Sequence, residues 1–316
     1  MTTLNILVTG GCGFVGSRLV TYLVEQGHSV TAVDIMWFGC HIENPTVRII
    51  QADFRSLSPE FLADFDALIH LANVANDPSV DLDPSLSWDI NTLGCYQLAT
   101  NAVKAGIRRF IYASSGSVYG VSNDDRVIES SEKVPISTYN KTKLAAEQIL
   151  EAFAARGELD LVVLRPATVC GLSPRMRLDV VVNLLTFQAL SEGVVTVLGG
   201  EQIRPHVHID DMVRAYDFFL NQSSVSGTFN VGFENCSILE LAHYVTEIHS
   251  AELRVEPSND PRSYRQDSQS LIDTGFRPIK GFRNAVDELG DAFRTGSLVS
   301  DPRWYSVSFM KNVKHD

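Results

Sequence analysis

Residues 4–17 read LNILVTGGCGFVGS, and they carry the strongest structural signal in the chain. The first half is an apolar run of a strand's length, and Gly10, Gly13 and Gly16 follow it in the pattern G-x-x-G-x-x-G. An amphipathic helical pattern over 14–26 begins inside the same stretch. Glycines at a strand-to-helix turn let the backbone approach a pyrophosphate at the helix N-terminus. The stretch therefore predicts a dinucleotide site.

Two carboxylates extend this prediction to the choice of cofactor. Asp34 ends the second predicted strand, 18 residues after Gly16, where a carboxylate can accept hydrogen bonds from both ribose hydroxyls. No arginine directly follows Asp34 to hold a 2′-phosphate, which favours NAD over NADP. Asp53 ends the third strand, and we expect it either to face the adenine edge or to cap the following helix.

The first half of the chain alternates short apolar runs with amphipathic stretches. This alternation predicts βαβ units and an α/β fold with a doubly wound parallel (Rossmann) sheet. The expected strands are 6–9, 29–34, 47–51, 67–70, 110–113 and 161–164, and the expected helices include 14–26, 85–104 and 137–156.

The rhythm ends at Arg165-Pro166, and mixed elements follow. They are an amphipathic helix after GLSPRMR, a strand near Thr196, a helix from Asp210 and a strand at 228–231. We expect residues 1–168 to form the NAD-binding domain and residues 169–316 a smaller mixed α/β domain for the substrate, some segments of which return to the first domain.

Composition narrows the class of protein. The net charge of −12 argues against binding to nucleic acid and to an anionic membrane surface. Five scattered cysteines without a C-x-x-C pair are typical of a reducing compartment. The N-terminus lacks the features of a signal peptide, and no apolar run reaches the length of a membrane span. We therefore expect a cytoplasmic protein.

A candidate acid–base pair lies in STYNKTK, residues 137–143. Tyr139 and Lys143 are four residues apart on a predicted helix, so they share a face. A free tyrosine titrates near ~10 and is a poor base at neutral pH. A nearby ammonium, together with a positive nicotinamide ring, favours the phenolate, so we expect a lowered pKa for Tyr139.

Together these features resemble the extended short-chain dehydrogenase/reductase family, in its branch that acts on nucleotide-sugars. The resemblance spans nearly the whole chain and is carried by the glycine turn, Asp34, Ser115, the Tyr139–Lys143 pair, HLA at 70–72, N-x-x-G at 91–94, SSGSVYG at 114–120 and RPHVHIDD at 204–211. It implies that Tyr139 is the acid/base, that Lys143 holds the cofactor ribose, and that Ser115 bonds the reacting sugar oxygen.

The resemblance also implies further binding residues and a homodimer. Around the NAD, it adds the following to the residues above: Phe14, Val15, Phe54, Leu71, Ala72 and Asn91, the last as a support of the active-site backbone. For the nucleotide-diphosphate sugar it implies Thr168, Asn183, Arg204 and Arg265 besides Ser115. Arg175 and Arg177 are either further phosphate ligands or solvated loop charges. The dimer is expected to form through the helices at 85–104 and 137–156.

The residues after Ser115 bear on the reaction. Relatives that eliminate water carry an acidic residue directly after the serine or threonine, whereas here Gly116 and Ser117 follow. A hydroxyl is too weak an acid and base at neutral pH to replace a carboxylate. The resemblance and this absence together favour an epimerase that inverts C4 through a transient 4-keto sugar, over a 4,6-dehydratase, a decarboxylase or a 4-keto-sugar reductase.

Some alternatives to this predicted function stay open. Thr168 stands where many relatives have asparagine, Asn73 replaces a small residue, and Cys170 could serve as acid/base in epimerisation at C3 or C5 or could simply pack. A non-catalytic sensor of the same fold is a further alternative, although Ser115, Tyr139 and Lys143 are all present. His206 and His208 have metal-ligand spacing, but a strand ending at a helix cap formed by Asp210 or Asp211 is the interpretation that we adopt, without a metal.

Overall fold

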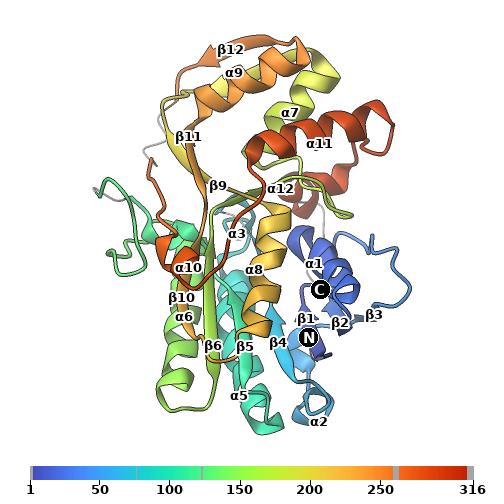
Figure 1. The fold of residues 1–316 in the computed structure, drawn as a ribbon, viewed down its shortest axis with the longest axis vertical. Helices are drawn as coiled ribbons and strands as arrows, with labels where there is room; N and C mark the ends of the chain where they lie inside the picture. Colours follow the sequence, from blue (N-terminus) through green and yellow to red (C-terminus); the bar gives the residue numbers. More distant parts are fainter. Residues whose placement is uncertain (1–2, 76, 122–123, 259–262, 312–316) are drawn as a thin grey trace.

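The computed structural model describes residues 3–75, 77–121, 124–258 and 263–311. Its centre is a seven-stranded parallel sheet in the order β10-β6-β5-β4-β1-β2-β3 (Figure 1). The strands are β1 (Asn5–Thr9), β2 (Ser29–Asp34), β3 (Arg48–Gln51), β4 (Ala67–His70), β5 (Arg109–Ala113), β6 (Asp160–Pro166) and β10 (Gly227–Val231). The predicted doubly wound parallel sheet is thus confirmed.

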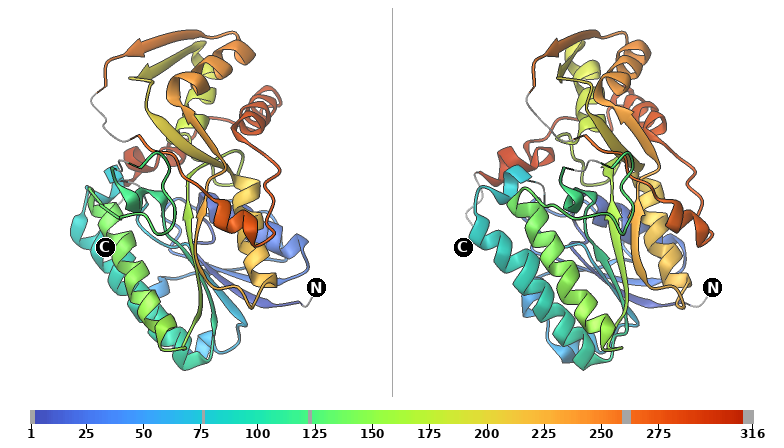
Figure 2. Two further views of the ribbon diagram at one scale, coloured as in Figure 1. Left: turned by 60° about the vertical axis from the view of Figure 1, so that its left-hand side comes forward. Right: turned by 90° about the vertical axis from the view of Figure 1, so that its left-hand side faces the viewer.

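Helices cover both faces of this sheet. One face carries α1 (Phe14–Glu25) and α8 (Ile209–Asn221), and the other carries α5 (Cys95–Ala105) and α6 (Thr138–Ala155). The right-hand view of Figure 2 shows the two pairs of helices on opposite sides of the sheet. Successive strand residues alternate between the two cores: Ile6 and Val8 pack with α1 and α8, while Leu7 packs with α5 and α6. A strand buried on both faces reads as a continuous apolar run, which is why periodicity placed the strands well.

Shorter helical segments complete the first layer. They are η1 (Phe54–Ser56), α2 (Pro59–Leu62), α3 (Asp77–Val80), α4 (Pro84–Trp88), η2 (Asp89–Gly94) and η3 (Gly116–Tyr119). The helix predicted over 85–104 is therefore three consecutive pieces, because the π-helical η2 separates α4 from α5. Asn91 and Thr92 in η2 hydrogen-bond Thr142 of α6, which fixes η2 against α6.

A smaller layer stands above the carboxyl ends of the strands (Figure 1). It contains two small sheets, β11-β9-β7 and β12-β8, and we call it the lid. Its strands and helices are β7 (Thr168–Cys170), α7 (Val181–Glu192), β8 (Val194–Leu198), β9 (Ile203–His208), β11 (Glu234–Ser237), α9 (Ile238–His249), β12 (Glu252–Glu256) and α11 (Phe282–Arg294). Three short segments remain: α10 (Gln269–Asp273), η4 (Pro302–Trp304) and α12 (Ser306–Met310).

Two elements that follow residue 168 in the sequence, and that we expected in the smaller domain, belong to the first layer instead. Strand β10 pairs with β6 at the edge of the large sheet, and α8 packs beside α1. The aromatic residues Tyr216 and Phe219 of α8 and Phe229 of β10 are buried in the core of that layer. The chain therefore crosses between the layers after residue 168, and the domain division at 168/169 stays a prediction.

Helix α8 is capped differently from our expectation. It begins at Ile209, and the Nδ1 atom of His208 accepts a hydrogen bond from the backbone N–H of Asp210 at 3.1 Å. Asp210 and Asp211 lie in the first turn, where negative charge interacts favourably with the helix dipole. In the part of the chain that the structure describes, no helix is both long and apolar enough to cross a bilayer.

Candidate active site

A cavity of about 610 Å³ lies between the sheet and the lid. At one end it is bounded by the glycine turn, where Gly10 has a positive φ of 74°. A Cβ on Gly10 would lie 2.5 Å from the backbone nitrogen of Ala72, and one on Gly16 would lie 2.1 Å from the carbonyl oxygen of Gly10. Glycine is thus required here so that α1 can start directly at the sheet edge, with its N-terminus facing the cavity.

Asp34 lies at the end of β2 and lines the cavity. Its carboxylate accepts from the backbone N–H groups of Cys12 and Met36 at 3.0 and 2.7 Å. Burial raises the pKa of Asp34, and these two hydrogen bonds oppose that rise. Asp53 also lines the cavity, and it caps η1 by accepting from the N–H of Arg55, so the structure shows the capping role that we weighed.

The surroundings of Asp34 fit a dinucleotide. Turn amides, a carboxylate and apolar side chains converge there, as binding of pyrophosphate, ribose and adenine requires. The predicted cofactor residues that line the cavity are Gly10, Gly13, Phe14, Val15, Gly16, Asp34, Asp53, Phe54, Leu71, Ala72, Tyr139 and Lys143. Sequence reasoning missed Trp37, Phe38, Ser306, Val307 and Met310, which line it as well.

Ser115, Tyr139 and Lys143 meet at the other end of the cavity. The Ser115 side chain hydrogen-bonds to the phenol of Tyr139, and its Oγ is 2.8 Å from the Oγ of Ser117. The Nζ of Lys143 is 6.0 Å from the ring centroid of Tyr139 and donates to the carbonyl of Ala113 at 2.7 Å. Helix α6 brings Tyr139 and Lys143 to one face, and the turn after β5 brings Ser115 to them.

The surroundings of Tyr139 in the protein alone do not favour its phenolate. Burial raises the pKa of its phenol to about 12; the hydrogen bond from Ser115 opposes this rise and the charge of Asp77 adds to it. Burial also lowers the pKa of Lys143 to about 7. The expected lowering of the pKa of Tyr139 included the positive charge of the nicotinamide ring, so it stays a prediction for the NAD-bound protein.

Two buried groups hold the backbone around this pair. Asn91 exchanges hydrogen bonds with both backbone groups of Val74, at 2.8 and 3.1 Å, in the segment that follows β4. Glu147, one turn beyond Lys143 on α6, accepts from Ser114 and from the guanidinium of Arg165. Asn91 therefore lies next to the cavity rather than in its wall, as expected of a support for the active-site backbone.

Only some of the residues predicted to bind the substrate line the cavity. Arg204 and Thr168 line the cavity together with Ser115. Asn183 is buried and bonds Gly171 and the carbonyl of Arg177, and the side chain of Arg265 is exposed, so neither is among the described residues that line the cavity. Their substrate roles stay predictions.

Asp77 and Tyr264 also line the cavity and were not assigned from the sequence, and Arg177, which was weighed as a phosphate ligand or a loop charge, lines it too. Asp77 lies at the start of α3 and accepts a hydrogen bond from Ser137, the N-cap residue of α6. Its charge contributes to the raised pKa of Tyr139. A carboxylate thus lies near the acid–base pair although none follows Ser115. Tyr264 directly precedes the predicted Arg265 in the chain.

Cys170 lies in the lid core rather than at the cavity. It is fully buried among apolar residues such as Val182 and Leu185, its Sγ donates to the carbonyl of Val207, and burial raises its pKa far above the ordinary value. A thiol in this environment is inert. The alternative that uses Cys170 as an acid/base therefore has no geometric support.

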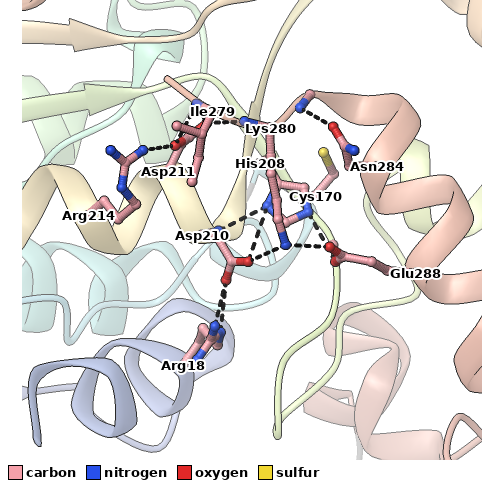
Figure 3. Close-up of polar contacts among 12 residues, drawn as sticks. Arg18, Cys170, His208, Asp210, Asp211, Arg214, Ile279, Lys280, Asn284 and Glu288 are labelled. Atoms are coloured by element: carbon pink, nitrogen blue, oxygen red, sulfur yellow. Dashed lines mark hydrogen bonds and ion pairs between the residues drawn. The ribbon is translucent and has the colours of Figure 1, made fainter. Parts of the chain in front are cut away.

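His208, Asp210 and Glu288 form a cluster of a kind that can hold a metal, and Figure 3 shows the side chains that pair with them. The Nζ of Lys280 lies 2.7 Å from Asp210 and 2.5 Å from Glu288, and Arg18 donates to Asp210 at 2.9 Å. The Nε2 of His208 is 3.1 Å from Glu288. Because two side-chain cations occupy the carboxylates, we interpret this group as an ion-pair network that joins α1 to the lid.

Comparison with known proteins agrees with this geometry. The model of the NAD dependent epimerase/dehydratase family matches residues 6–232. The chain belongs to that family. Membership confirms the resemblance seen in the sequence and the NAD cofactor, because the match includes the glycine turn, Asp34, Ser115, Tyr139 and Lys143.

Individual relatives of this epimerase/dehydratase family member differ in their reactions. A solved structure of MoeE5 with UDP-glucuronic acid and NAD is 31% identical, with a TM-score of 0.82, and covers 92% of this chain and 99% of its own. A UDP-glucose 4-epimerase of Lactobacillus helveticus is 26% identical and covers 92% of this chain and 96% of its own. UDP-glucuronic acid decarboxylase 1 of Danio rerio is 28% identical and covers 87% and 69%.

Proposed function

We propose that this protein is an NAD-dependent nucleotide-sugar epimerase that inverts C4 through a transient 4-keto sugar. The observation that carries the proposal is the meeting of Ser115, Tyr139 and Lys143 in one cavity, with Gly116 and Ser117 at the positions after Ser115. These three side chains can move a proton at one carbon, and NAD, when bound, would supply the hydride acceptor. Gly116 and Ser117 supply no acid that could expel a leaving group from a neighbouring carbon.

Each of the three side chains has a separate task in this reaction. Ser115 hydrogen-bonds the sugar hydroxyl that is oxidised, and Tyr139 takes the proton from that hydroxyl and returns it after the sugar has turned over. Lys143 holds the cofactor ribose and supplies positive charge beside the phenol. NAD, when bound, accepts the hydride and returns it to the opposite face of the sugar, and its positive ring favours the phenolate that the protein alone disfavours.

The packing around Gly116 supports a reaction without elimination. A Cβ at this position would lie 3.1 Å from both the Oε1 of Gln266 and the carbonyl of Pro166. Gln266 is 2% exposed and donates to the carbonyl of Arg165 at 2.7 Å, so it is held in place. A side chain at residue 116 would therefore require Gln266 or the backbone of Pro166 to shift by a few tenths of an ångström. The tight packing around Gly116 thus disfavours a carboxylate at this position.

Two arginines of the cavity suit a substrate diphosphate. Arg204 and Arg177 both line the cavity, and guanidinium groups bind phosphate oxygens through two parallel hydrogen bonds. Arg177 is also paired with Asp179 at 2.9 Å, which orients it. We assign both to the diphosphate of the nucleotide-sugar, so Arg177 joins the predicted Arg204.

Asp77 favours one second candidate, a nucleotide-sugar dehydratase. An elimination needs an acid or base besides the tyrosine, and Asp77 is a carboxylate that lines the cavity near Tyr139. Its hydrogen bond from Ser137 holds one of its oxygens. The epimerase remains our proposal because Asp77 comes from α3, not from the loop that carries Ser115.

Product analysis separates the two candidates. The purified protein is incubated with a panel of nucleotide-diphosphate sugars without added cofactor, and the products are followed by NMR. A C4 epimer supports the proposal. A 4-keto-6-deoxy sugar identifies a dehydratase, and a pentose with released CO2 identifies a decarboxylase. In a second incubation with added NADH, turnover that consumes NADH in equal amounts identifies a reductase; each of these outcomes contradicts the proposal.

The variant Asp77→Asn tests the role of the carboxylate. If the protein is an epimerase, this variant keeps the same product and changes mainly the apparent affinity for the substrate. A dehydratase that uses Asp77 would lose about 10²- to 10⁴-fold in turnover. Asp81→Asn is the matched control, because Asp81 is exposed and lies one helical turn further along the chain.

We further infer a homodimer formed through α5 and α6. Tyr96, Thr100 and Val103 of α5 and Ile149 and Phe153 of α6 line a shallow groove on the outside of this layer. Tyr96 and the neighbouring Leu93 are 53% and 60% exposed. Large apolar side chains gathered on two adjacent helices are typical of an interface between copies of one chain.

A further inference from the structure

The last described segment of the chain returns to the cofactor half of the cavity. Residues 302–310, which comprise η4 and α12, lie against the loop after β2 and against α3. Figure 2 shows the red α12 beside the cyan segment that contains α3. We call residues 302–310 the C-terminal strap. The match to the family ends at residue 232, so the strap lies outside it.

The inner side of the strap forms part of the cavity wall. Ser306, Val307 and Met310 line the same cavity as Asp34 and Phe38. Phe309 and Trp304 pack against Phe38 and His41 of the loop that follows Asp34, the predicted ribose ligand. These contacts place the strap at the adenosine half, although α12 also contacts α3. An adenosine bound there is covered by the strap on the side away from the sheet.

Apolar side chains and two backbone hydrogen bonds fix the strap. Trp304 is 8% exposed and packs in one cluster with Phe14 of the glycine turn. Phe309 packs against Phe38 with ring centroids 5.4 Å apart. The carbonyl of Trp304 accepts from the N–H of Leu178 at 2.9 Å, and the N–H of Ser306 donates to Asp179 at 2.9 Å.

Arg175 joins the strap to the loop after β2. Its guanidinium is 4.1 Å from the ring centroid of Phe38, and it donates to the carbonyl of Arg303 and to the Oγ of Ser306 at 3.2 and 3.0 Å. Arg175 is 3% exposed and lines the cavity, while its Nε has no hydrogen-bond partner among the residues that the structure describes. A buried N–H is normally satisfied by another protein group, a water or a ligand.

The connection before the strap permits it to move as a unit. Gly296 has a φ of 75°, and Val299 is 61% exposed. A short terminal segment held by a few side chains opens at a lower free energy than the core. Opening the strap breaks the Phe38–Phe309 contact, the Arg175 bonds, the packing of Trp304 and the hydrogen bonds to Leu178 and Asp179, without disturbing the parallel sheet.

We propose that the C-terminal strap closes the adenosine half of the cofactor cleft and must open before NAD is exchanged. The strap thereby belongs to the cofactor site and sets the rate of cofactor release. This inference depends on NAD binding alone, so it holds for an epimerase and for a dehydratase. Retention of the cofactor suits a reaction that regenerates NAD in every cycle.

The variant Phe309→Ala tests the strap in the full chain. Phe309 packs on Phe38, and its loss should weaken closure without altering the residues around Tyr139. We expect NAD to dissociate at least about tenfold faster from Phe309→Ala than from the wild type. The rate is measured by adding excess NADH and following its fluorescence as it replaces the bound NAD. Val299→Ala is the matched control: it removes an exposed apolar side chain just before the strap and should leave the rate unchanged.

Two fragments of the cofactor locate the effect. Phe309→Ala should weaken binding of ADP-ribose, which contains the adenosine half, and leave binding of nicotinamide mononucleotide unchanged. In the wild-type protein, NAD should slow hydrogen exchange at the amides of Trp304, Ser306 and Phe309. An unchanged NAD dissociation rate in Phe309→Ala, or equal weakening of both fragments, would overturn the proposal. The hydrogen-exchange measurement uses the wild-type protein, so it remains informative if Phe309→Ala is unstable. Amide exchange rates in the strap that do not change when NAD is added would also overturn the proposal.

Discussion

Glu147 and Arg165 form an ion pair in the interior of the large layer. The Nε and a terminal nitrogen of Arg165 donate to the two carboxylate oxygens of Glu147 at 3.0 and 2.6 Å, and both side chains are at most 2% exposed. Ser114 donates to the same carboxylate. The pair therefore ties α6, the helix of Tyr139 and Lys143, to β6 and to the turn that carries Ser115.

Replacing Glu147 by glutamine should destabilise the protein by about 3 kcal/mol, because the buried charge of Arg165 then has no counter-charge. The measurement is the free energy of unfolding from urea titration followed by circular dichroism. Glu158→Gln is the matched control, since Glu158 pairs with Arg156 at the surface, where solvent screens the pair, and its replacement should cost much less. Similar losses in both variants would show that burial of the pair does not matter.

Tyr139→Phe should reduce turnover by about 10²- to 10⁴-fold, because the phenol is the group that we propose takes the proton from the sugar. Substrate binding, measured by calorimetry, should change little, since the ring remains. Tyr244→Phe, on the lid helix α9, is the control and should retain full turnover. An active Tyr139→Phe enzyme would remove this phenol from the mechanism.

Lys143 should make the NAD-free protein more stable as pH rises. Burial lowers its pKa in the folded protein to about 7, whereas in the unfolded chain it stays near ~10.4. Between these values the unfolded state binds the extra proton, so stability increases with pH by at most about 1.4 kcal/mol per pH unit.

Comparison with Lys143→Met isolates this effect. The free energy of unfolding of the wild type, minus that of the variant, should rise by about 2 kcal/mol between pH 7 and pH 9. Urea titrations at both pH values measure it. A difference that stays constant over this range would contradict a lowered pKa for Lys143.

The network of Figure 3 should hold the lid to α1 between mildly acidic and alkaline pH. Although burial opposes ionisation, hydrogen bonds from Lys280 lower the pKa of Asp210, and those from His208 and Lys280 lower the pKa of Glu288. A lowered carboxyl pKa adds stability above the ordinary value near ~4, and this stability is lost as pH falls through the folded value.

Lys280→Met removes the central cation of that network. At pH 7 it should cost about 1 kcal/mol, because the carboxylates are partly exposed and Asp210 keeps Arg18. The difference from the wild type should shrink below pH 4, where the carboxylates become protonated. Thermal unfolding at pH 7 and pH 3.5 measures it, and a cost that is unchanged at low pH would contradict the pairing.

Tyr96→Arg should convert the inferred dimer to a monomer, because it places a charge in the apolar groove between α5 and α6. Light scattering after size-exclusion chromatography should give twice the mass of one chain for the wild type and a single mass for the variant. Ile248→Arg, at an exposed apolar position on the lid, is the control. A monomeric wild type would refute the interface.

The sequence by itself determined the parts of this protein that depend on neighbours along the chain. The strand–turn–helix around Gly10 is local, because sterics at each glycine and the apolar period of α1 act over a few residues. The same holds for Tyr139 and Lys143, which share a face because they are one turn apart. Strands β2 and β4 match their predicted bounds, since burial on both faces makes them continuous apolar runs.

Only the tertiary structure decided what distant segments do to each other. It placed β10 in the large sheet, buried Cys170 away from the cavity, and set Gln266 against Gly116. It also brought Asp77 towards Tyr139 and the strap over the adenosine half of the cavity. These contacts join segments far apart in the chain, and they follow from how whole layers pack. No local period encodes that packing, which is why residues such as Asp77 and Arg175 could not be assigned from the sequence.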